Sequence, residues 1–90
     1  MLAPDYTAQF RRDLRKVQNR GYDVDKLKQI ITTLLEERPL NQALRDHPLK
    51  GEWKDYRELH IAPDWLLIYK IKGNICVFYR TGTHSDLFGM

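Results

Sequence analysis

The sequence predicts an α+β fold, in which an N-terminal two-helix hairpin packs on an antiparallel β-sheet to form two layers. Two observations predict this fold. Apolar residues recur at helical spacing through the first half of the chain, whereas aromatic and β-branched runs broken by turn residues fill the second half. Because no repeat, low-complexity tract or linker interrupts the chain, we expect a single domain over residues 1–90.

The first helix is expected over residues 7–20. Phe10, Leu14 and Val17 recur at helical spacing within this segment. Gly21 is well placed to end the helix, because glycine adopts the left-handed backbone conformation that often follows a helix C-terminus.

The second helix carries the clearest periodic signal in the sequence. Its apolar residues follow the spacing of a wide stripe on one helix face: Leu27, Ile30, Ile31, Leu34 and Leu35. Asp23 or Asp25 is suited to cap its start, and Pro39 lies just beyond its end. Since only residues 21–23 separate the two helices, they should form a hairpin.

Three strands are expected in the second half, over residues 56–61, 65–71 and 74–80. The segments between them carry turn residues, with proline and aspartate after the first strand and glycine and asparagine after the second. The middle strand is almost continuously apolar, which indicates a central strand covered on both faces. Residues 83–88 are typical of a capped turn or short helix that folds back onto the sheet.

Composition and charge limit the classes of function. The formal net charge is +3, and basic residues crowd into one segment of the first helix: Arg11, Arg12, Arg15, Lys16 and Arg20. Such a cluster favours a polyanion or an acidic protein as partner, although the solvated face of an amphipathic helix has the same pattern. The single cysteine, Cys76, excludes an internal disulfide and suits a reducing cytoplasm. With no secretory signal or membrane span evident, we expect a soluble cytoplasmic protein.

Candidate catalytic residues gather near the ends of the predicted strands. All three histidines lie after the helical half, each at a strand end or in a loop: His47, His60 and His84. If consecutive strands pair as hairpins, His60 lies close to Asp64 and Trp65. Whether Arg80 and His84 join this cluster depends on the order of the strands, which the sequence leaves open.

A zinc site is one chemistry that such a cluster could serve. Zinc-binding motifs commonly take two ligands from residues about three to five positions apart, and no two histidines are that close. His60 and Asp64 are four residues apart, but Pro63 between them excludes a helical ligand pair. We therefore expect neither a metal nor any other cofactor.

The second chemistry is metal-free RNA cleavage, in which the phosphodiester is transferred to the neighbouring 2′-hydroxyl. It needs a base for the 2′ proton, an acid for the leaving 5′-oxygen and a cation for the phosphorane. Histidine, with a pKa near ~6.5, serves as acid or base, and Arg80 can bind two phosphate oxygens. Trp65 and Phe88 are candidates for stacking on bases, whereas core packing is expected for Trp53 and most tyrosines.

Three separated segments of the chain also resemble the YafQ-type toxins of the RelE superfamily. They cover residues 46–54, 57–69 and 80–88, whereas the N-terminal helix is similar only in pattern. The resemblance implies a microbial RNase fold and cleavage of mRNA in the ribosomal A site without a metal. It also implies two partners: the ribosome, with its 16S rRNA near the A site, and a cognate antitoxin encoded nearby.

The family's active-site positions match a set of residues in the second half of the chain: His47, His60, Asp64, Arg80, His84 and Phe88, with Trp65 beside them. As hypotheses, we assign His84 as the general acid and Arg80 as the phosphate clamp. Asp64 or His60 is then the base or its orienter, and His47 supports them. From charge alone, the basic residues of the first helix are candidates for contacting RNA. Two alternatives stay open: a non-catalytic basic module that binds RNA or protein, and a zinc-dependent hydrolase.

Overall fold

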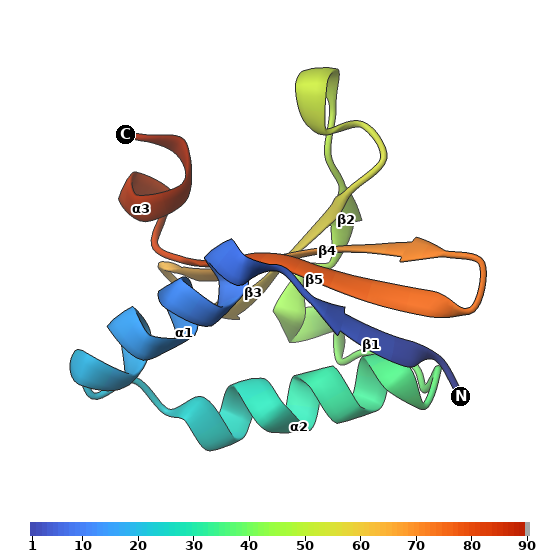
Figure 1. The fold of residues 1–90 in the computed structure, drawn as a ribbon, viewed down its shortest axis with the longest axis horizontal. Helices are drawn as coiled ribbons and strands as arrows, with labels where there is room; N and C mark the ends of the chain where they lie inside the picture. Colours follow the sequence, from blue (N-terminus) through green and yellow to red (C-terminus); the bar gives the residue numbers. More distant parts are fainter. Residues whose placement is uncertain (90) are drawn as a thin grey trace.

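The computed structural model describes residues 1–89 as a five-stranded β-sheet with two long helices on one face and a short helix on the other (Figure 1). The elements follow one another as β1 (Ala3–Tyr6), α1 (Ala8–Asn19), α2 (Val24–Leu35), the 3-10 turn η1 (Gln42–Leu44), β2 (His47–Pro48), the 3-10 turn η2 (Gly51–Trp53), β3 (Arg57–Ala62), β4 (Trp65–Lys72), β5 (Ile75–Gly82) and α3 (His84–Phe88). The α+β class predicted from the sequence is confirmed.

The helices α1 and α2 begin at capped positions. The Thr7 side chain accepts a hydrogen bond from the Phe10 backbone N–H at 2.9 Å, and the Asp23 carboxylate accepts one from Lys26 at 3.3 Å. The predicted span of the first helix, residues 7–20, includes α1 and both of its capping residues. Asp23 is thus the cap of α2, and the short connection between the two helices gives the expected hairpin.

The sheet has the strand order β1-β5-β4-β3-β2, so β4 is central, as its apolar sequence predicts. Neighbouring strands are antiparallel except β1, which pairs in parallel with β5. The sheet is therefore mixed, and β1 is an element that the sequence analysis did not predict. Its four residues lack the β-branched pattern of a strand and include Pro4, which an edge strand tolerates because one side of its backbone needs no partner.

The apolar core lies between the helices and the sheet. Phe10 and Val17 of α1 and Leu27 of α2 pack with inward side chains of the central strands, including Leu67 and Phe78. All of these side chains are almost completely buried. Since burial of apolar area is the main stabilising contribution in a small domain, this layer fixes how the helices sit on the sheet.

A second, smaller apolar cluster covers the opposite side of the sheet, which we call the open face. Its buried residues are Leu66, Ile68 and Leu87, and half-buried apolar side chains pack around them. Alternation along β4 sends Leu66 and Ile68 to this face and Leu67 to the helices, so the strand is covered on both faces as predicted.

Cys76 is completely buried in the main core, where desolvation raises the pKa of its thiol to about 11. This placement agrees with the sequence analysis, which assigned Cys76 to an apolar strand. Across residues 1–89, no helix combines the length and apolar character needed to cross a membrane.

Candidate active site

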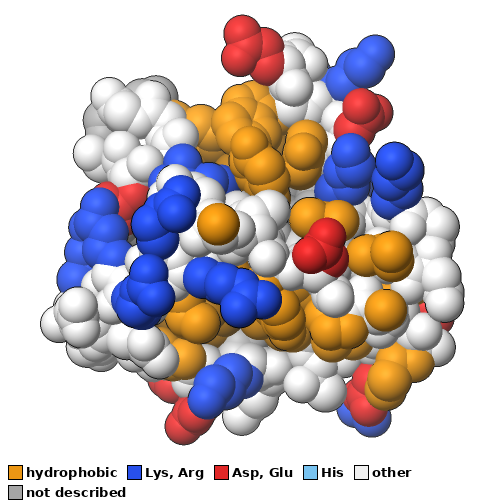
Figure 2. Space-filling model, in the orientation of Figure 1, with side chains coloured by type: hydrophobic (Ala, Val, Ile, Leu, Met, Phe, Trp, Pro, Cys, Tyr) orange, Lys and Arg blue, Asp and Glu red, His pale blue; other side chains and the backbone are white. Residues whose placement is uncertain are grey.

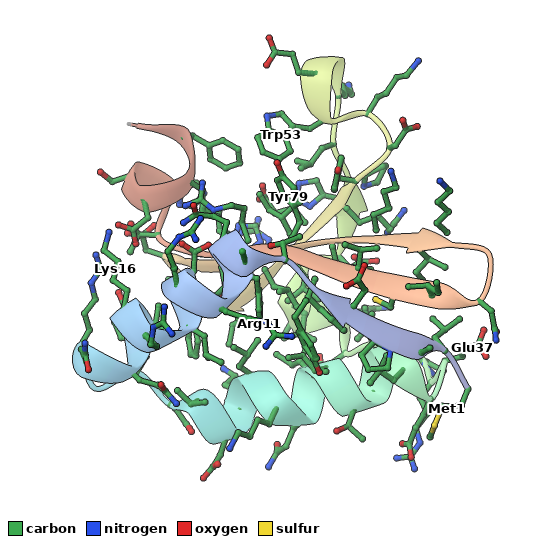
Figure 3. The ribbon with its side chains drawn as sticks, viewed as in Figure 1. Met1, Arg11, Lys16, Glu37, Trp53 and Tyr79 are labelled. Carbon is green, nitrogen blue, oxygen red and sulfur yellow. The ribbon has the colours of Figure 1, made fainter. Side chains whose placement is uncertain are left out.

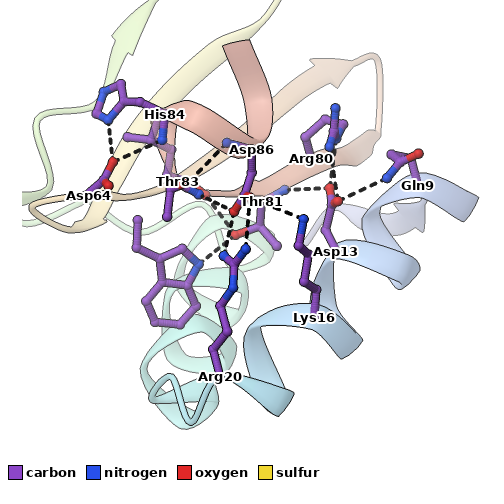
Figure 4. Close-up of polar contacts among 12 residues, drawn as sticks. Gln9, Asp13, Lys16, Arg20, Asp64, Arg80, Thr81, Thr83, His84 and Asp86 are labelled. Atoms are coloured by element: carbon purple, nitrogen blue, oxygen red, sulfur yellow. Dashed lines mark hydrogen bonds and ion pairs between the residues drawn. The ribbon is translucent and has the colours of Figure 1, made fainter. Parts of the chain in front are cut away.

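His84 and Asp64 form a direct hydrogen-bonded pair (Figure 4). His84 is the first residue of α3, and Asp64 lies in the turn between β3 and β4. Asp64 Oδ1 accepts hydrogen bonds from the His84 backbone N–H at 3.0 Å and from His84 Nδ1 at 2.7 Å. These bonds lower the pKa of Asp64, the backbone bond most strongly. Because a carboxylate only accepts, His84 carries a proton on Nδ1 and exchanges protons through Nε2.

The three histidines lie in a row. The ring of His60 stands between the other two, with its centroid 6.1 Å from that of His47 and 6.0 Å from that of His84. The strand order produces this row, because His60 pairs with Leu66 and Leu66 pairs with Gly82, just before α3. Asp64, which the sequence analysis places beside His60, hydrogen-bonds to His84 instead.

Glu58 joins this row, although the sequence analysis did not single it out. Its side chain is buried, and Oε1 lies 3.7 Å from His47 Nε2 and 3.9 Å from His60 Nε2. Desolvation lowers the pKa of His60, and the negative charge of Glu58 partly opposes this effect. Among the described residues, none makes a hydrogen bond to the buried His60 Nδ1. His60 is therefore neutral at neutral pH and able to accept a proton.

Polar contacts fix the segment around His47, at the start of β2. Its Nδ1 donates to the Arg45 carbonyl oxygen at 2.7 Å, since a carbonyl only accepts. The preceding residue, Asp46, accepts hydrogen bonds from the Arg57 guanidinium at 2.8 Å and from the Tyr69 hydroxyl. Burial, followed by the bond to Asp46, raises the pKa of Tyr69. Because Nδ1 of His47 is occupied by its bond to Arg45, Nε2 is the atom through which His47 faces Glu58.

Arg80 lies on β5 and is held by Asp13, a buried residue of α1 (Figure 4). Arg80 Nε and Nη2 donate to the two Asp13 oxygens at 2.8 and 3.1 Å, and the Thr81 backbone N–H donates to Asp13 at 3.2 Å. Asp13 uses one edge of the guanidinium, so Nη1 remains available for a phosphate oxygen. The bond to Asp13 also raises the pKa of Arg80.

The two candidates for base stacking are placed differently from each other. Phe88 on α3 is half-buried on the open face, where its ring meets Trp53 edge to face at 6.1 Å. Trp65 is only 4% exposed, and its indole N–H donates to Thr81 Oγ1 at 2.9 Å. This burial argues against the stacking of Trp65 on RNA bases, because β4 directs the side chain into the core beneath the helices.

The basic residues of α1, together with Arg20 at its C-cap, divide into two groups. Arg11, Arg12 and Arg15 are exposed, and Figure 2 shows Lys and Arg side chains spread over this part of the surface. Lys16 and Arg20 reach α3, where their side-chain nitrogens lie 3.3 and 2.6 Å from the Asp86 carboxylate. These two residues therefore tie α1 to the helix that carries His84 (Figure 4).

The structure also brings together a set of metal-ligand atoms that the sequence spacing did not predict. One ligand atom from each of Glu58, His60 and His84 lies within 4.8 Å of the others. Imidazole nitrogen with one carboxylate is a donor set that suits Zn²⁺ and other divalent transition metals. Beside these residues is a groove of about 540 Å³ that is lined by both histidines and by the basic side chains of Lys26 and Arg45.

Comparison with known protein families shows to which family the chain belongs. A family model described as "Bacterial toxin of type II toxin-antitoxin system, YafQ" matches residues 2–89. The chain belongs to the YafQ toxin family. It is 45% identical over 86 residues to the mRNA interferase toxin YafQ of Escherichia coli strain K12, with 94% of each chain covered. The same values hold for the mRNA interferase toxin YafQ of E. coli strain B / BL21-DE3.

Solved structures of YafQ proteins are similar over almost the whole chain. The crystal structure of YafQ from E. coli strain BL21(DE3) has a TM-score of 0.93 at 42% identity, covering 99% of this chain and 100% of that one. The E. coli DinJ-YafQ complex gives 0.92 at 43% identity with the same coverage. A metal-bound toxin from Helicobacter pylori gives 0.91 at 41% identity, covering 98% of this chain and 100% of that one.

The sequence analysis missed two buried acids of this YafQ-family site, although each left a signal. Glu58 lies two residues before His60 on a strand, so both point to the open face. Asp13 lies three residues after Phe10 and four before Val17, on the apolar side of α1. A charged residue at an apolar position predicts a buried partner, which here is Arg80.

Proposed function

We propose that this chain is a ribosome-dependent mRNA endoribonuclease, the toxin of a type II toxin–antitoxin pair, that inhibits translation by cleaving mRNA in the A site. The observation that carries the proposal is the row of three histidines, with Asp64 holding His84 by its Nδ1 proton. The name of the E. coli relatives, mRNA interferase toxin, supports RNA as substrate. Acting on ribosomes requires a cytoplasmic location.

The proposed chemistry is transfer of the phosphodiester to the neighbouring 2′-oxygen. The base removes the 2′-hydroxyl proton, the 2′-oxygen bonds to phosphorus, the bond from phosphorus to the 5′-oxygen breaks, and the acid protonates that oxygen. His60 serves as the base, because desolvation keeps it neutral. His84 serves as the acid through Nε2, with Asp64 stabilising its imidazolium form.

The remaining residues stabilise charges that form during the reaction or position the RNA. Arg80 stabilises the phosphorane through the part of its guanidinium that Asp13 leaves available. Glu58, beside Nε2 of both His47 and His60, stabilises the positive charge that forms when His60 takes up the proton. His47 supports this pair, and Phe88 contacts a base next to the scissile phosphate.

The same site has a metal-dependent alternative. Glu58, His60 and His84 are close enough to share an ion, and one similar toxin, from H. pylori, is described as metal-bound. In that case, a metal-activated water or hydroxyl would replace histidine as the base. A chelator that binds transition metals but spares the Mg²⁺ of the ribosome distinguishes the two, since only the metal-dependent reaction stops in its presence.

A cognate antitoxin is the proposed protein partner. The structure of the E. coli DinJ-YafQ complex supports this assignment for a relative that is 43% identical. The net charge of +3 favours an acidic partner, and binding to the folded toxin alone would raise its stability.

The test is cleavage of a defined mRNA in the A site of programmed ribosomes, at constant Mg²⁺ and with an excess of a chelator selective for transition metals. Wild type and Ser85→Ala, an exposed neighbour on the same helix, should cleave, whereas His84→Ala should lose at least about 100-fold in rate while staying folded. Cleavage that returns only with added metal would favour the metal-dependent alternative. Intact mRNA with every variant would favour a non-catalytic RNA- or protein-binding module.

A further inference from the structure

The open face of the sheet carries a group of aromatic rings, which we call the aromatic platform. It consists of four of the ten aromatic residues in the chain: Trp53, Tyr56, Tyr79 and Phe88. Trp53 contacts the other three rings at centroid distances of 5.7, 5.5 and 6.1 Å, and Tyr56 lies 4.9 Å from Tyr79. Residues far apart in sequence thus form one continuous surface.

The platform is partly open to solvent. Its four side chains are half-buried, whereas the apolar residues beneath them, Leu66 and Ile68, are fully buried. Figure 2 shows hydrophobic side chains reaching the surface beside α3, and Figure 3 places Trp53 and Tyr79 together there. A contiguous apolar patch that stays partly exposed is typical of a binding surface.

The platform adjoins the proposed catalytic residues. Phe88 and His84 occupy the same short helix, and Tyr79 directly precedes Arg80 on β5. In the sheet, Arg80 pairs with Ile68, which pairs with Glu58 on the other side. A strand of RNA with its phosphate at Arg80 therefore has the platform next to it.

Two basic residues lie at the edge of the aromatic platform. Lys70 Nζ lies 5.1 Å from the centroid of the Tyr56 ring, and Arg80 borders Tyr79. Flat rings flanked by cations match a single-stranded nucleic acid, whose bases stack on the rings while its phosphates meet the cations.

We propose that the aromatic platform binds an unstacked base of the RNA strand next to the scissile phosphate. This inference rests on the proposed function, which it extends by naming where a flanking nucleotide binds. The stacking role that sequence reasoning assigned to Trp65 passes to Trp53 and Tyr79, because these side chains lie on the open face whereas Trp65 is buried on the opposite face.

The experiment titrates ¹⁵N-labelled protein with a short single-stranded RNA in which every nucleotide carries a 2′-O-methyl group. This group removes the nucleophile, so binding is measured without cleavage. The chain has two tryptophans, and their indole N–H signals provide an internal comparison. The signal of Trp53 should shift on binding, whereas that of the buried Trp65, bonded to Thr81, should stay nearly constant.

An abasic scan identifies stacking directly. Replacing one nucleotide at a time by an abasic residue should weaken binding about 5- to 100-fold at one or two adjacent positions and little elsewhere. In Trp53→Leu and Tyr79→Leu, the intact RNA should bind more weakly and the abasic penalty should shrink. Tyr22→Leu, on the opposite face of the sheet, is the matched control and should keep the wild-type penalty.

The wild-type titrations need no variant, so a substitution that fails to fold leaves the test valid. The proposal is overturned if Trp53 does not respond at millimolar RNA, or if all abasic positions bind equally. A stronger Trp53 response to an acidic peptide of the same length would also overturn it and assign the platform to a protein. Base-dependent binding without ribosomal cleavage by the wild type would contradict the proposed function and leave the platform standing.

Discussion

Arg80 and Asp13 form a charge pair that couples the proposed catalytic role of Arg80 to the stability of the fold. Asp13 is 4% exposed, and its carboxylate accepts hydrogen bonds from Arg80, Thr81 and Gln9. A variant that removes only the guanidinium leaves a buried negative charge without its strongest partner, which is costly in a region of low dielectric. Loss of activity in such a variant would therefore not by itself assign a role to Arg80.

Arg80→Ala should lower the free energy of unfolding by about 3 kcal/mol, because it breaks a buried ion pair. The double variant Arg80→Ala, Asp13→Asn should recover most of this loss of stability, since the asparagine still accepts a hydrogen bond from Thr81. Its rate of cleavage should nevertheless stay at least about 100-fold below that of wild type. Urea unfolding and single-turnover cleavage measure the two quantities. Recovery of cleavage in the double variant would show that Arg80 acts only through the fold.

If His60 is the base, as proposed, its pKa sets the acid side of the pH dependence. Desolvation lowers this pKa below the ordinary value of 6.5, so the base form should persist, and cleavage should continue, below that pH. Glu58 raises the pKa of His60, so Glu58→Gln should move the acid limb of the pH–rate profile to lower pH. Single-turnover rates between about pH 4.5 and 8 test this direction. An unchanged limb would mean that another group is the base.

At the scale of elements, the position of His84 depends on how α3 is attached to the rest of the fold. Asp86 accepts a hydrogen bond from the Thr83 backbone N–H at 3.0 Å, completing the capping box of α3, and binds Arg20 of α1. The bond from Arg20 is the largest cause that holds the pKa of Asp86 far below its usual range. Gly82 permits this approach, because a Cβ there would lie 2.9 Å from Asp86 Oδ2.

Asp86→Asn should lower Tm at pH 7, because the charged partner of Arg20 is lost. The lowered pKa means that the folded state favours the ionised carboxylate, so its contribution is present at neutral pH. That contribution falls as the pH drops below 3.8, where the unfolded carboxyl takes up a proton. When Tm is measured from pH 7 to about pH 3, the curves of wild type and Asp86→Asn should approach each other toward the acid end. Asp55→Asn, at an exposed position, is the control. A difference in Tm between wild type and Asp86→Asn that does not change with pH would contradict this explanation.

At the scale of the whole molecule, the exposed arginines of α1 lie on a different surface from the candidate active site. The exposed arginines of α1, Arg11, Arg12 and Arg15, lie on the helix layer, whereas the histidine row and the aromatic platform lie on the open face. A toxin acting in the ribosome would be enclosed by RNA, so both surfaces could meet phosphates. The arginines should then govern binding, and the open face the reaction.

The triple variant Arg11→Ala, Arg12→Ala and Arg15→Ala should bind ribosomes more weakly, with little change in the rate of cleavage once bound. The slope of log affinity against log salt concentration should fall by about 0.7–0.9 for each phosphate that is no longer neutralised. Arg38→Ala, at an exposed arginine beyond α2 that pairs with Glu36, is the control and should leave the slope unchanged. An unchanged slope in the triple variant would assign the α1 arginines to solvation alone.

The sequence alone determined the features that depend on local physics. Apolar spacing predicted α1 and α2, turn residues separated the three long strands, and continuous apolarity identified β4 as central. Resemblance in three segments then indicated the YafQ-type family and its candidate residues. These features were accessible because helix periodicity, turn chemistry and matching motifs need no knowledge of long-range contacts.

Only the tertiary structure decided which distant residues meet. Strand order placed His84 beside Asp64 and His60, and the packing of α1 on β5 joined Asp13 to Arg80. Strand alternation cannot say which face the helices will cover, so Trp65 of β4 was expected at the surface, whereas it is buried. Trp53 was expected in the core, whereas it lies in η2, half-exposed on the open face. The helices bury whichever face gains the larger apolar contact, and that choice is made by the whole fold.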